Sequence, residues 1–429
     1  MRLHIANGRL IDPANGVDGQ HDLYIAGGRV VAVGAAPDAF QADRHIDAKG
    51  LAVLPGLIDL SARVTQAGNA GFAPAELRAA LAGGVTRLVL PPDAESPPDE
   101  PTKIEALLRH TPAAQSAIHP LGAMTVGLAG ETLTEMALLA RAGCIAFAQG
   151  ESLVADTRVL WGAMRYASGL GQTLWLRPQD PWLARGTSAA SGPYAERLGL
   201  EGMPAQAETV ALQTIFELQR ATGARVHLSR LSTAAGVDLL RAARREGLPV
   251  TADVSINNLL LTDVDIGFFD TNHHLSPPLR GQRDRDALQS ALADGVIDAL
   301  CSDHTPVDAR GKAAPFAAAT PGATGLELLL SLALKWARDS RRPVGDALTR
   351  ITTGPAAVLS AVAPHLGRCG HLGVNVPADL CLADLDTEWM VMPAALQSRS
   401  AQTPFAGMML PGQVRATVVG GELAWETPV

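Results

Sequence analysis

Residues 224–254 read ARVHLSRLSTAAGVDLLRAARREGLPVTADV, and this stretch shows the repeating unit of the fold most clearly. It contains an apolar run at 224–231, a helical pattern at 234–245 and a second apolar run at 249–254. The helical part carries its valine and leucines on one side and its arginines largely on the other, which predicts an amphipathic surface helix. Two apolar strands joined by such a helix are typical of a parallel β/α unit.

The same alternation continues on both sides of this stretch. The predicted strands are 51–58, 85–91, 117–124, 144–148, 173–176, 224–231, 249–254 and 298–302, and the predicted helices between them include 74–82, 133–142, 208–222, 234–245 and 284–293. Eight apolar strands with helical crossovers favour a closed TIM (β/α)8 barrel over an open sheet. The sequence therefore predicts an α/β fold built on such a barrel.

The two ends of the chain have a different sequence pattern. Short alternating runs at 3–6, 9–11, 22–26 and 29–33 are separated by turn residues, and similar runs occur at 379–383, 413–419 and 423–425. Glycine pairs such as Gly420 and Gly421 between short strands are a hairpin signal. We therefore expect residues 1–52 and 371–429 to form one small composite β-sandwich and residues 53–370 to form the barrel.

Composition limits the classes of partner. The chain has 429 residues, 47% of them hydrophobic, and a net charge of −8, which argues against nucleic acid or an anionic membrane as the main partner. No uncharged apolar run reaches the length of a membrane span, and the first residues lack the apolar segment of a signal peptide. The four cysteines share no CxxC spacing, so we expect buried thiols in a reducing compartment, the cytoplasm.

Four short runs carry a resemblance to a known family. They are LPGLIDLSAR at 54–63, PPLR at 277–280, CSDHTP at 301–306 and TPF at 403–405. In this order they resemble the dihydroorotase branch of the cyclic amidohydrolases, and the resemblance extends over nearly the whole chain. It implies a TIM barrel of the amidohydrolase type with a small sandwich made from both termini, in agreement with the fold predicted above.

The resemblance also implies a metal centre at the strand ends. Active members bind one or two zinc ions through a His-x-His pair, a bridging Asp or carboxylated Lys, two further His and an Asp, and metal-bound hydroxide attacks the amide while the Asp moves the proton. In this sequence only that last Asp is retained, as a vestigial catalytic residue, Asp303. The other positions read Ser61, Arg63, Gln149, Arg177 and Arg230.

The substrate-binding positions implied by the resemblance differ as well. The arginine that normally follows the histidine pair and holds the substrate carboxylate is Thr65. The usual Pro-Asn-Thr after the second strand reads Pro91-Pro92-Asp93, and the paired histidines after the seventh strand read Asn257-Asn258.

These replacements have a direct chemical consequence. Arginine has five N–H donors and no acceptor, and it stays protonated, so it cannot be a zinc ligand. Three fixed positive charges would repel Zn²⁺, and the carboxylate of Asp303 alone cannot hold a catalytic metal. We therefore predict no metal or other cofactor, and a structural ion-pair cluster in which the arginines neutralise Asp303.

The functional prediction follows from the resemblance. Some bacteria carry a dihydroorotase-like chain that lacks the metal ligands and is needed to assemble aspartate transcarbamoylase, and this sequence looks like that pseudoenzyme. The implied role is a non-catalytic subunit of pyrimidine biosynthesis, in a hetero-oligomer with the aspartate transcarbamoylase catalytic chain.

Two alternatives stay open. The first is an active dihydroorotase, or a relative acting on allantoin or hydantoin, with zinc in an atypical site that uses Asp303, His227 and either His304 or His273. The second is a sensor that binds carboxylates or phosphates in an arginine-rich pocket. Against the first, His227 is read as a core histidine, and adjacent residues such as His273 and His274 rarely chelate one ion because they point to opposite faces of an extended segment.

Overall fold

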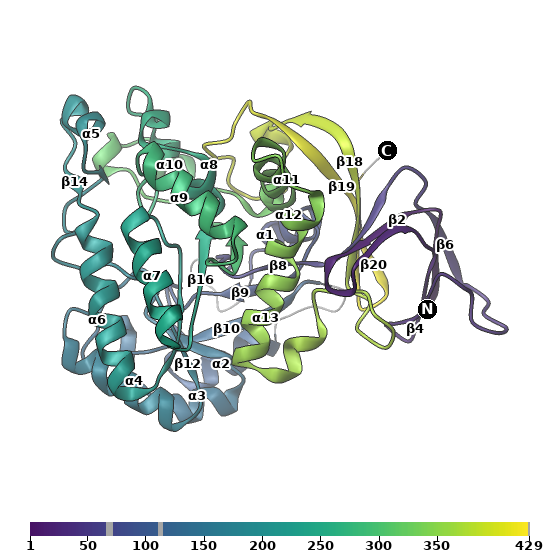
Figure 1. Cartoon of the computed structure of the whole chain (residues 1–429), viewed down its shortest axis with the longest axis horizontal. Helices are drawn as coiled ribbons and strands as arrows, with labels where there is room; N and C mark the ends of the chain where they lie inside the picture. The colour runs from purple at the N-terminus through teal and green to yellow at the C-terminus, as the bar shows by residue number, and fades with distance from the viewer. Residues whose placement is uncertain (66–71, 110–114, 428–429) are drawn as a thin grey trace.

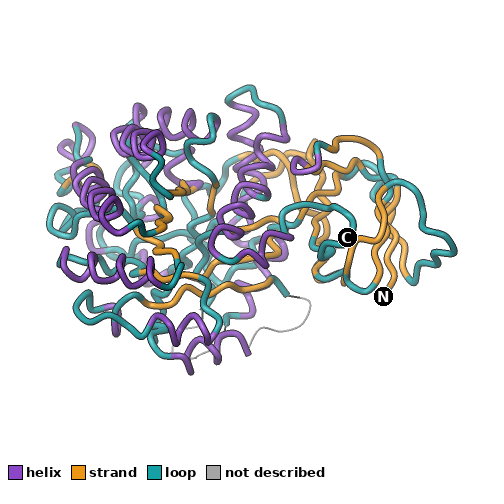
Figure 2. The backbone as a smooth tube through the Cα atoms, turned by 60° about the horizontal axis from the view of Figure 1, so that its bottom comes forward, coloured by secondary structure: helices purple, strands orange, loops and turns teal. Residues whose placement is uncertain are grey.

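The computed structural model describes residues 1–65, 72–109 and 115–427. A larger body of strands and helices lies at one end of the molecule, and a smaller body built mainly of strands lies at the other (Figures 1 and 2). The strands at residues 2–6 and 422–426 both belong to the smaller body. Between them the chain forms the larger body, and the segment 397–400 contacts that body again, where Ser398 donates to Glu76.

The larger body is built around eight parallel strands in one sheet. Their order is β17-β16-β15-β12-β11-β10-β9-β8, so sequence neighbours are spatial neighbours. The first and last strands approach each other through a parallel bridge between Ala62 and His304, where the Arg63 amide donates to the His304 carbonyl at 2.9 Å. The barrel is thus nearly closed, and the predicted TIM-barrel fold is confirmed. The strands are β8 Leu57–Asp59, β9 Val85–Leu90, β10 Ala117–Ala123, β11 Ala146–Ala148, β12 Thr173–Leu176, β15 Arg225–Leu228, β16 Val250–Ser255 and β17 Ala299–Cys301.

Helices cover the outside of this barrel. The segment 234–245 forms helix α7, which buries Val237, Leu240 and Ala243 and exposes Arg245. Its valine and one leucine face the core as the pattern predicts. The helices are α1 Pro74–Ala82, α2 Pro101–Arg109, α3 Met136–Ala142, α4 Thr157–Gly169, α5 Pro193–Leu198, α6 Gln206–Thr222, α7 Ala234–Glu246, α8 Ile256–Leu260, α9 Gln282–Ala293, α10 Ala309–Lys312, α11 Leu329–Asp339, α12 Val344–Ile351 and α13 Thr353–Val362. A minor two-stranded sheet joins β13 Ala189–Ala190 to β14 Gly202–Met203.

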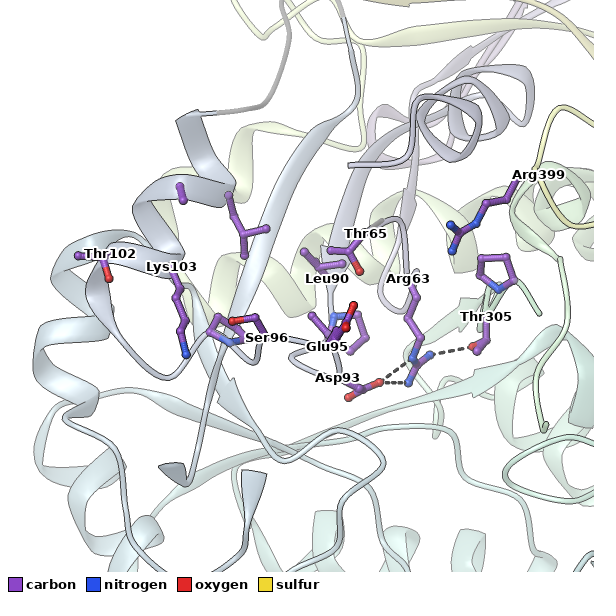
Figure 3. Close-up of a pocket in the computed structure, with 16 residues that line it drawn as sticks. Arg63, Thr65, Leu90, Asp93, Glu95, Ser96, Thr102, Lys103, Thr305 and Arg399 are labelled. Atoms are coloured by element: carbon purple, nitrogen blue, oxygen red, sulfur yellow. Dashed lines mark hydrogen bonds and ion pairs between the residues drawn. The ribbon is translucent and has the colours of Figure 1, made fainter. Parts of the chain in front are cut away.

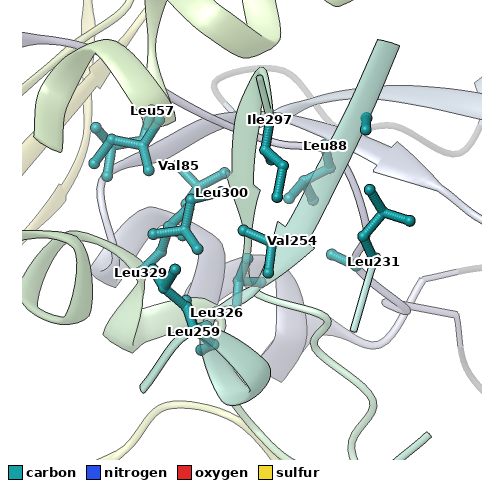
Figure 4. Close-up of a cluster of buried hydrophobic side chains, with 14 of the residues drawn as sticks. Leu57, Val85, Leu88, Leu231, Val254, Leu259, Ile297, Leu300, Leu326 and Leu329 are labelled. Carbon is teal, nitrogen blue, oxygen red and sulfur yellow. The ribbon is translucent and has the colours of Figure 1, made fainter. Parts of the chain in front are cut away.

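The barrel core lies between the strands and these helices. Figure 4 shows side chains of β8, β9, β16 and β17, among them Leu57 and Leu300, packed with Leu259 of α8 and Leu329 of α11. Burial of this continuous apolar layer is the main source of stability of such a fold.

The smaller body consists of two sheets. One has the order β5-β4-β1-β6 and the other β20-β19-β18-β7-β2-β3, so the second sheet contains strands from both chain ends. Ile5 and Leu23 of the first sheet share one buried cluster with Leu380 and Val418 of the second. The strands are β1 Arg2–Ala6, β2 Arg9–Asp12, β3 Val17–Gln20, β4 Leu23–Ala26, β5 Arg29–Val33, β6 Arg44–Asp47, β7 Ala52–Pro55, β18 Leu380–Met390, β19 Met409–Val419 and β20 Glu422–Glu426.

The predicted strand 51–58 is wrong as a single element. Its first part is β7, which pairs with β18 in the terminal sheet, and its second part is β8 of the barrel. Gly56 lies between them, packed so closely against Thr86 that an added Cβ would overlap that side chain. The change of sheet falls at Gly56, whereas the division of the chain into domains at residues 52 and 53 stays a prediction.

The structure also describes the cysteines and the lengths of the apolar helices, which the sequence analysis considered. All four cysteines are buried free thiols, as expected. Among the helices of the described residues, none is long and apolar enough to cross a membrane.

Candidate functional site

Charged side chains from six strand ends meet at the mouth of the barrel. Because the strands are parallel, their carboxyl ends open on the same face, where TIM barrels carry their functional residues. The positive members of this mouth cluster are arginines, and the negative members are carboxylates. The cluster consists of Arg63 after β8, Asp93 after β9, Glu151 after β11, Arg177 after β12, Arg230 after β15 and Asp303 after β17.

Glu151 is the central acceptor of the cluster. Arg230 donates from Nη2 to its Oε1 at 2.6 Å, and Arg63 donates from Nη2 to the same oxygen at 2.9 Å. Arg177 donates from Nη1 to the other oxygen, Oε2. One carboxylate therefore links three guanidinium groups that come from three different strand ends.

The other two carboxylates hold the outer sides of the arginines. Arg230 donates from Nη1 to Asp303 Oδ1 at 2.8 Å, and Arg63 Nη1 lies 3.5 Å from the same oxygen. Asp93 accepts from Arg63 Nε at 2.6 Å. Figure 3 shows Arg63 between Asp93 and Thr305, whose hydroxyl it also reaches at 3.0 Å.

The loop before the PPLR run closes the cluster. Ser276 accepts a hydrogen bond at its hydroxyl from Arg177 Nη2 at 2.7 Å, and its carbonyl accepts from Arg230 Nη1 at 3.1 Å. The same hydroxyl lies 3.3 Å from Glu151 Oε2. These contacts fix the guanidinium planes, because each arginine is held from more than one direction.

Two members of the cluster have strained backbones. Arg230 has φ 59° and Asp303 has φ 50°, in the left-handed region that side chains with a Cβ rarely adopt. Such a conformation costs of order 1–3 kcal/mol and persists only where surrounding contacts enforce it. Here the ion pair between these two residues supplies such a contact.

The three positive and three negative charges balance, and they set the protonation of the group. Burial acts to raise the pKa of Glu151, but Arg177, Arg230 and Arg63 outweigh it and hold that pKa well below its usual range. Burial raises the pKa of Asp303, although Arg230 and Arg63 oppose this. Burial acts to lower the pKa of Arg230, but Asp303 and Glu151 raise it well above the ordinary value. The arginine therefore stays charged at every physiological pH.

The residues at the barrel mouth do not fit a zinc centre. The guanidinium groups offer only N–H donors, and the carboxylates beside them are engaged by those donors. Within 1–65, 72–109 and 115–427, no group of three or more His, Cys, Asp or Glu is arranged to hold a metal ion. No chemical step through a metal is derived for this site.

The histidines considered for an atypical active site are engaged elsewhere. His227 is buried, with Nε2 2.9 Å from Asp253 Oδ2 and Nδ1 2.8 Å from the Thr251 hydroxyl. His304 lies 3.0 Å from Glu76 through Nε2 and accepts the Gly325 amide at Nδ1. His273 lies 3.1 Å from Asp270, three residues before it.

The structure brings four of the six predicted site residues together, namely Arg63, Arg177, Arg230 and Asp303. Ser61 lies beside them and lines a small cavity under the cluster. Gln149 turns away, because its amide donates to the Thr125 hydroxyl at 2.8 Å and to the Leu128 carbonyl at 2.9 Å. That these positions correspond to metal ligands of active relatives stays a prediction.

Two members of the cluster were not predicted as site residues. Glu151 lies two residues beyond Gln149, and Asp93 was noted only as a departure from a motif. The signal that points to both is charge balance, since three buried arginines and a single aspartate leave two positive charges to be neutralised.

A larger cavity of about 700 Å³ opens beside the cluster. Arg63, Asp93 and Thr305 lie on its cluster side, and Lys103 of α2 and Arg399 lie farther out (Figure 3). Its lining combines both signs of charge with apolar side chains such as Leu90 and Leu107.

The fold is that of a barrel of the amidohydrolase type. The L-hydantoinase structure from Arthrobacter aurescens superposes with a TM-score of 0.85, covering 100% of this chain and 96% of that chain at 23% identity. At that identity, the likeness concerns the fold alone.

Sequence comparison gives the family. A family model described as Dihydro-orotase-like matches residues 50–235. A dihydroorotase-like protein of Pseudomonas aeruginosa is 41% identical over 429 residues, covering 99% of this chain and 100% of the relative. A dihydroorotase of Anaeromyxobacter dehalogenans is 35% identical over 429 residues, covering 99% of this chain and 98% of the relative. The chain belongs to the dihydroorotase-like family.

Proposed function

We propose that this chain is a non-catalytic dihydroorotase homologue of pyrimidine biosynthesis in the cytoplasm. Its role is to support assembly of aspartate transcarbamoylase by binding that enzyme's catalytic chain in a hetero-oligomer. The observation that carries the proposal is the mouth cluster, in which Arg63, Arg177 and Arg230 are paired with carboxylates at the strand ends.

The chemistry of the cluster supports the absence of turnover. Hydrolysis of a cyclic amide needs an activated water and a group that polarises the carbonyl. The guanidinium groups that could polarise a carbonyl already donate to Glu151, Asp93 and Asp303. The carboxylate that could take a proton, Asp303, is bonded to Arg230.

The retention of the whole fold supports a structural role. The chain aligns over 99% of its length with relatives named dihydroorotase-like protein and dihydroorotase. A barrel and a two-sheet body of this size provide broad rigid surfaces, which is what a subunit of an assembly needs.

The test is reconstitution with the aspartate transcarbamoylase catalytic chain of the same organism. The two chains are co-expressed with a tag on only one of them, and the purified material is passed through size-exclusion chromatography with light scattering. We expect one complex with a mass above that of the catalytic trimer and with transcarbamoylase activity. The variant Asp303→Ala loses the ion pair with Arg230 and therefore some stability, but its folded form is expected to assemble with the catalytic chain, because Asp303 has no catalytic task in this proposal.

Two results would contradict it. One is separate elution of the two chains in size-exclusion chromatography at every protein concentration tested. The other is cyclisation of carbamoyl aspartate by the isolated chain with zinc bound stoichiometrically and loss of that activity in Asp303→Ala, which would establish the active-enzyme alternative.

A further inference from the structure

One large apolar side chain of the barrel body lies almost wholly in solvent. Phe268 is 89% exposed, and Val264 in the same segment is 59% exposed. This segment, residues 261–270, follows α8 and includes the 3-10 helix η3 Asp263–Ile266. Burial of a phenylalanine side chain is strongly favourable, and the isolated chain does not obtain that stabilisation from Phe268. Exposed apolar side chains that gather in one segment are typical of interaction surfaces.

The turn that carries Phe268 is held from both sides. Ile266 before it is buried in a small apolar cluster with residues of α5, and Phe269 after it packs against that cluster. The Tyr194 hydroxyl of α5 donates to the Gly267 carbonyl at 2.7 Å. Gly267 and Phe269 have positive φ angles of 57° and 62°, which reverse the chain between these anchored residues. The exposed ring therefore stands on a fixed backbone, so binding through it costs little ordering entropy.

The charge of the same segment is negative. Residues 261–279 contain no lysine or arginine, and they contain three aspartates, Asp263, Asp265 and Asp270. Asp270 lies 3.1 Å from His273, but burial lowers the pKa of that imidazole, so it stays neutral at pH 7 and does not cancel the carboxylate. Helix α5 adds one charge of each sign, Glu196 and Arg197.

Lys312 does not change this sign at the surface. Its ammonium donates to the carbonyls of Thr271 at 2.8 Å and His274 at 3.2 Å, and the residue is only 6% exposed. The exposed charges of the segment around Phe268 are therefore carboxylates.

The sign of this charge selects the kind of partner. A symmetric contact between two copies of the chain would bring the same aspartates of each copy close together, which their like charges oppose. An anionic membrane surface or a nucleic acid is repelled for the same reason. The surface fits a protein with an apolar pocket whose rim carries lysine or arginine, because such a pocket takes the phenyl ring and its rim pairs with the carboxylates.

We propose that the Phe268 surface, defined by Val264, Asp265, Phe268 and Asp270, is a contact surface for the aspartate transcarbamoylase catalytic chain. Phe268 enters an apolar pocket of that chain, and basic residues at the pocket rim face the two aspartates. This inference rests on the proposed function, which supplies the partner. Figure 1 places α5, which the surface adjoins, at the end of the barrel body away from β2 and β6, so this contact leaves the two-sheet body free.

The test measures the dissociation constant of the two purified chains by biolayer interferometry. We expect Phe268→Ala to weaken binding by roughly 30-fold, as truncation of an anchoring aromatic residue does. Its melting temperature should equal that of the wild type, because the side chain is exposed. The matched control is Val374→Ala, which removes a side chain that is 63% exposed beside β5, where the Asn375 amide donates to the Val30 carbonyl. This control should bind like the wild type.

The outcomes separate the contact surface from the assembly role. A wild type that does not bind the catalytic chain overturns both. A wild type that binds, together with a Phe268→Ala variant that binds equally well, overturns only the contact surface. A loss of affinity in Val374→Ala as large as that in Phe268→Ala would also overturn the assignment to this surface.

A photo-cross-link identifies the partner directly. Phe268 is replaced by benzoylphenylalanine, the two chains are mixed and irradiated, and the products are digested and analysed by mass spectrometry. We expect a cross-link from position 268 to the catalytic chain. A cross-link between two copies of this chain, or the absence of any cross-link to the catalytic chain, would overturn the proposal.

The expected charge of the partner is tested by Asp270→Asn. Asparagine can keep the hydrogen bond that Asp270 accepts from the Asn272 amide at 3.0 Å, so the local turn is retained. We expect slower association with the catalytic chain at low ionic strength and a weaker dependence of that rate on salt, with the dissociation rate nearly unchanged. An association rate equal to or above that of the wild type would overturn the assignment of a basic pocket rim.

Discussion

Among single residues, Glu151 has the largest role in holding the barrel mouth together. Its two oxygens accept from three arginines, and its own side chain is 37% exposed while those arginines are nearly buried. Removing its charge leaves three guanidinium groups with two carboxylates. The energetic effect therefore lies mainly with the arginines, which lose a partner but stay charged.

The first prediction concerns the neutral variant Glu151→Gln. We expect the free energy of unfolding to fall by about 2–3 kcal/mol, below the 3–5 kcal/mol of a fully buried pair because the carboxylate is partly exposed. Urea unfolding at pH 7 measures it. The control is Glu246→Gln, which disrupts the exposed pair with Arg220 and should lower the free energy of unfolding far less, because water screens that pair. Equal losses in the two variants would contradict the role given to Glu151.

The second prediction concerns how the difference in unfolding free energy between the wild type and Glu151→Gln depends on pH. The pKa of Glu151 is lower in the folded chain than its ordinary value of 4.5, so its contribution to stability is present above that pH and is lost as the pH falls below it. The raised pKa of Asp303 acts in the opposite direction. We expect the stability gap between wild type and Glu151→Gln to narrow from pH 6 to pH 4 in urea unfolding. A gap that stays constant or widens would show that Glu151 is not the titrating group.

Part of the mouth cluster could be predicted from the sequence, residue by residue. Arg63, Arg177, Arg230 and Asp303 could be placed because each directly follows an apolar strand, and the strand ends of a barrel converge. Gln149 was predicted as a degenerate metal-ligand position, and it lies outside the cluster, whereas Glu151 two residues later belongs to it. The chain turns at Gly150, which has φ 60°, so Gln149 points to Thr125 and Glu151 points to the arginines. A turn of this kind is not visible in the apolar pattern.

At the scale of elements, the turn after β11 decides which side chain enters the cluster. Gly150 has a left-handed backbone, and a Cβ built on it would overlap the carboxylate of Asp93. Asp93 is itself held by Arg63, so it cannot move aside without breaking an ion pair. The turn at Gly150 after β11 therefore depends on where Asp93 lies after β9.

The third prediction is that Gly150→Ala destabilises the chain by about 1–3 kcal/mol, through backbone strain and overlap with Asp93. Its measurement is the midpoint of urea unfolding. Gly345→Ala in α12 is the matched control, because a Cβ there meets nothing within 4 Å, and it should be neutral or slightly stabilising. A Gly150→Ala variant as stable as the control would mean that the turn does not constrain the cluster.

Most barrel elements could be predicted from the sequence because their strands are short and mainly apolar. The failures have physical reasons. Strand β3 reads VDGQ and β6 reads RHID, and neither alternates in polarity. The run 51–58 is apolar throughout, so its pattern contains no sign of the switch between sheets at Gly56, which depends on close packing against Thr86.

At the scale of the whole molecule, the chain combines a complete barrel with a two-sheet body formed by both termini. The fold is that of an amidohydrolase, while the mouth of the barrel carries ion pairs that satisfy one another. The proposed function depends on this contrast, because a fold can be kept while the side chains at its functional face change.

The metal content of the purified chain decides between a metal centre and an ion-pair cluster at the barrel mouth. The protein is incubated with excess zinc, freed of unbound metal by gel filtration and analysed by elemental mass spectrometry, beside an active dihydroorotase treated in the same way. We predict far less than one zinc ion per chain and no cyclisation of carbamoyl aspartate. One or two zinc ions per chain, together with cyclisation, would contradict the central claim that arginine–carboxylate pairs stand in place of a metal centre.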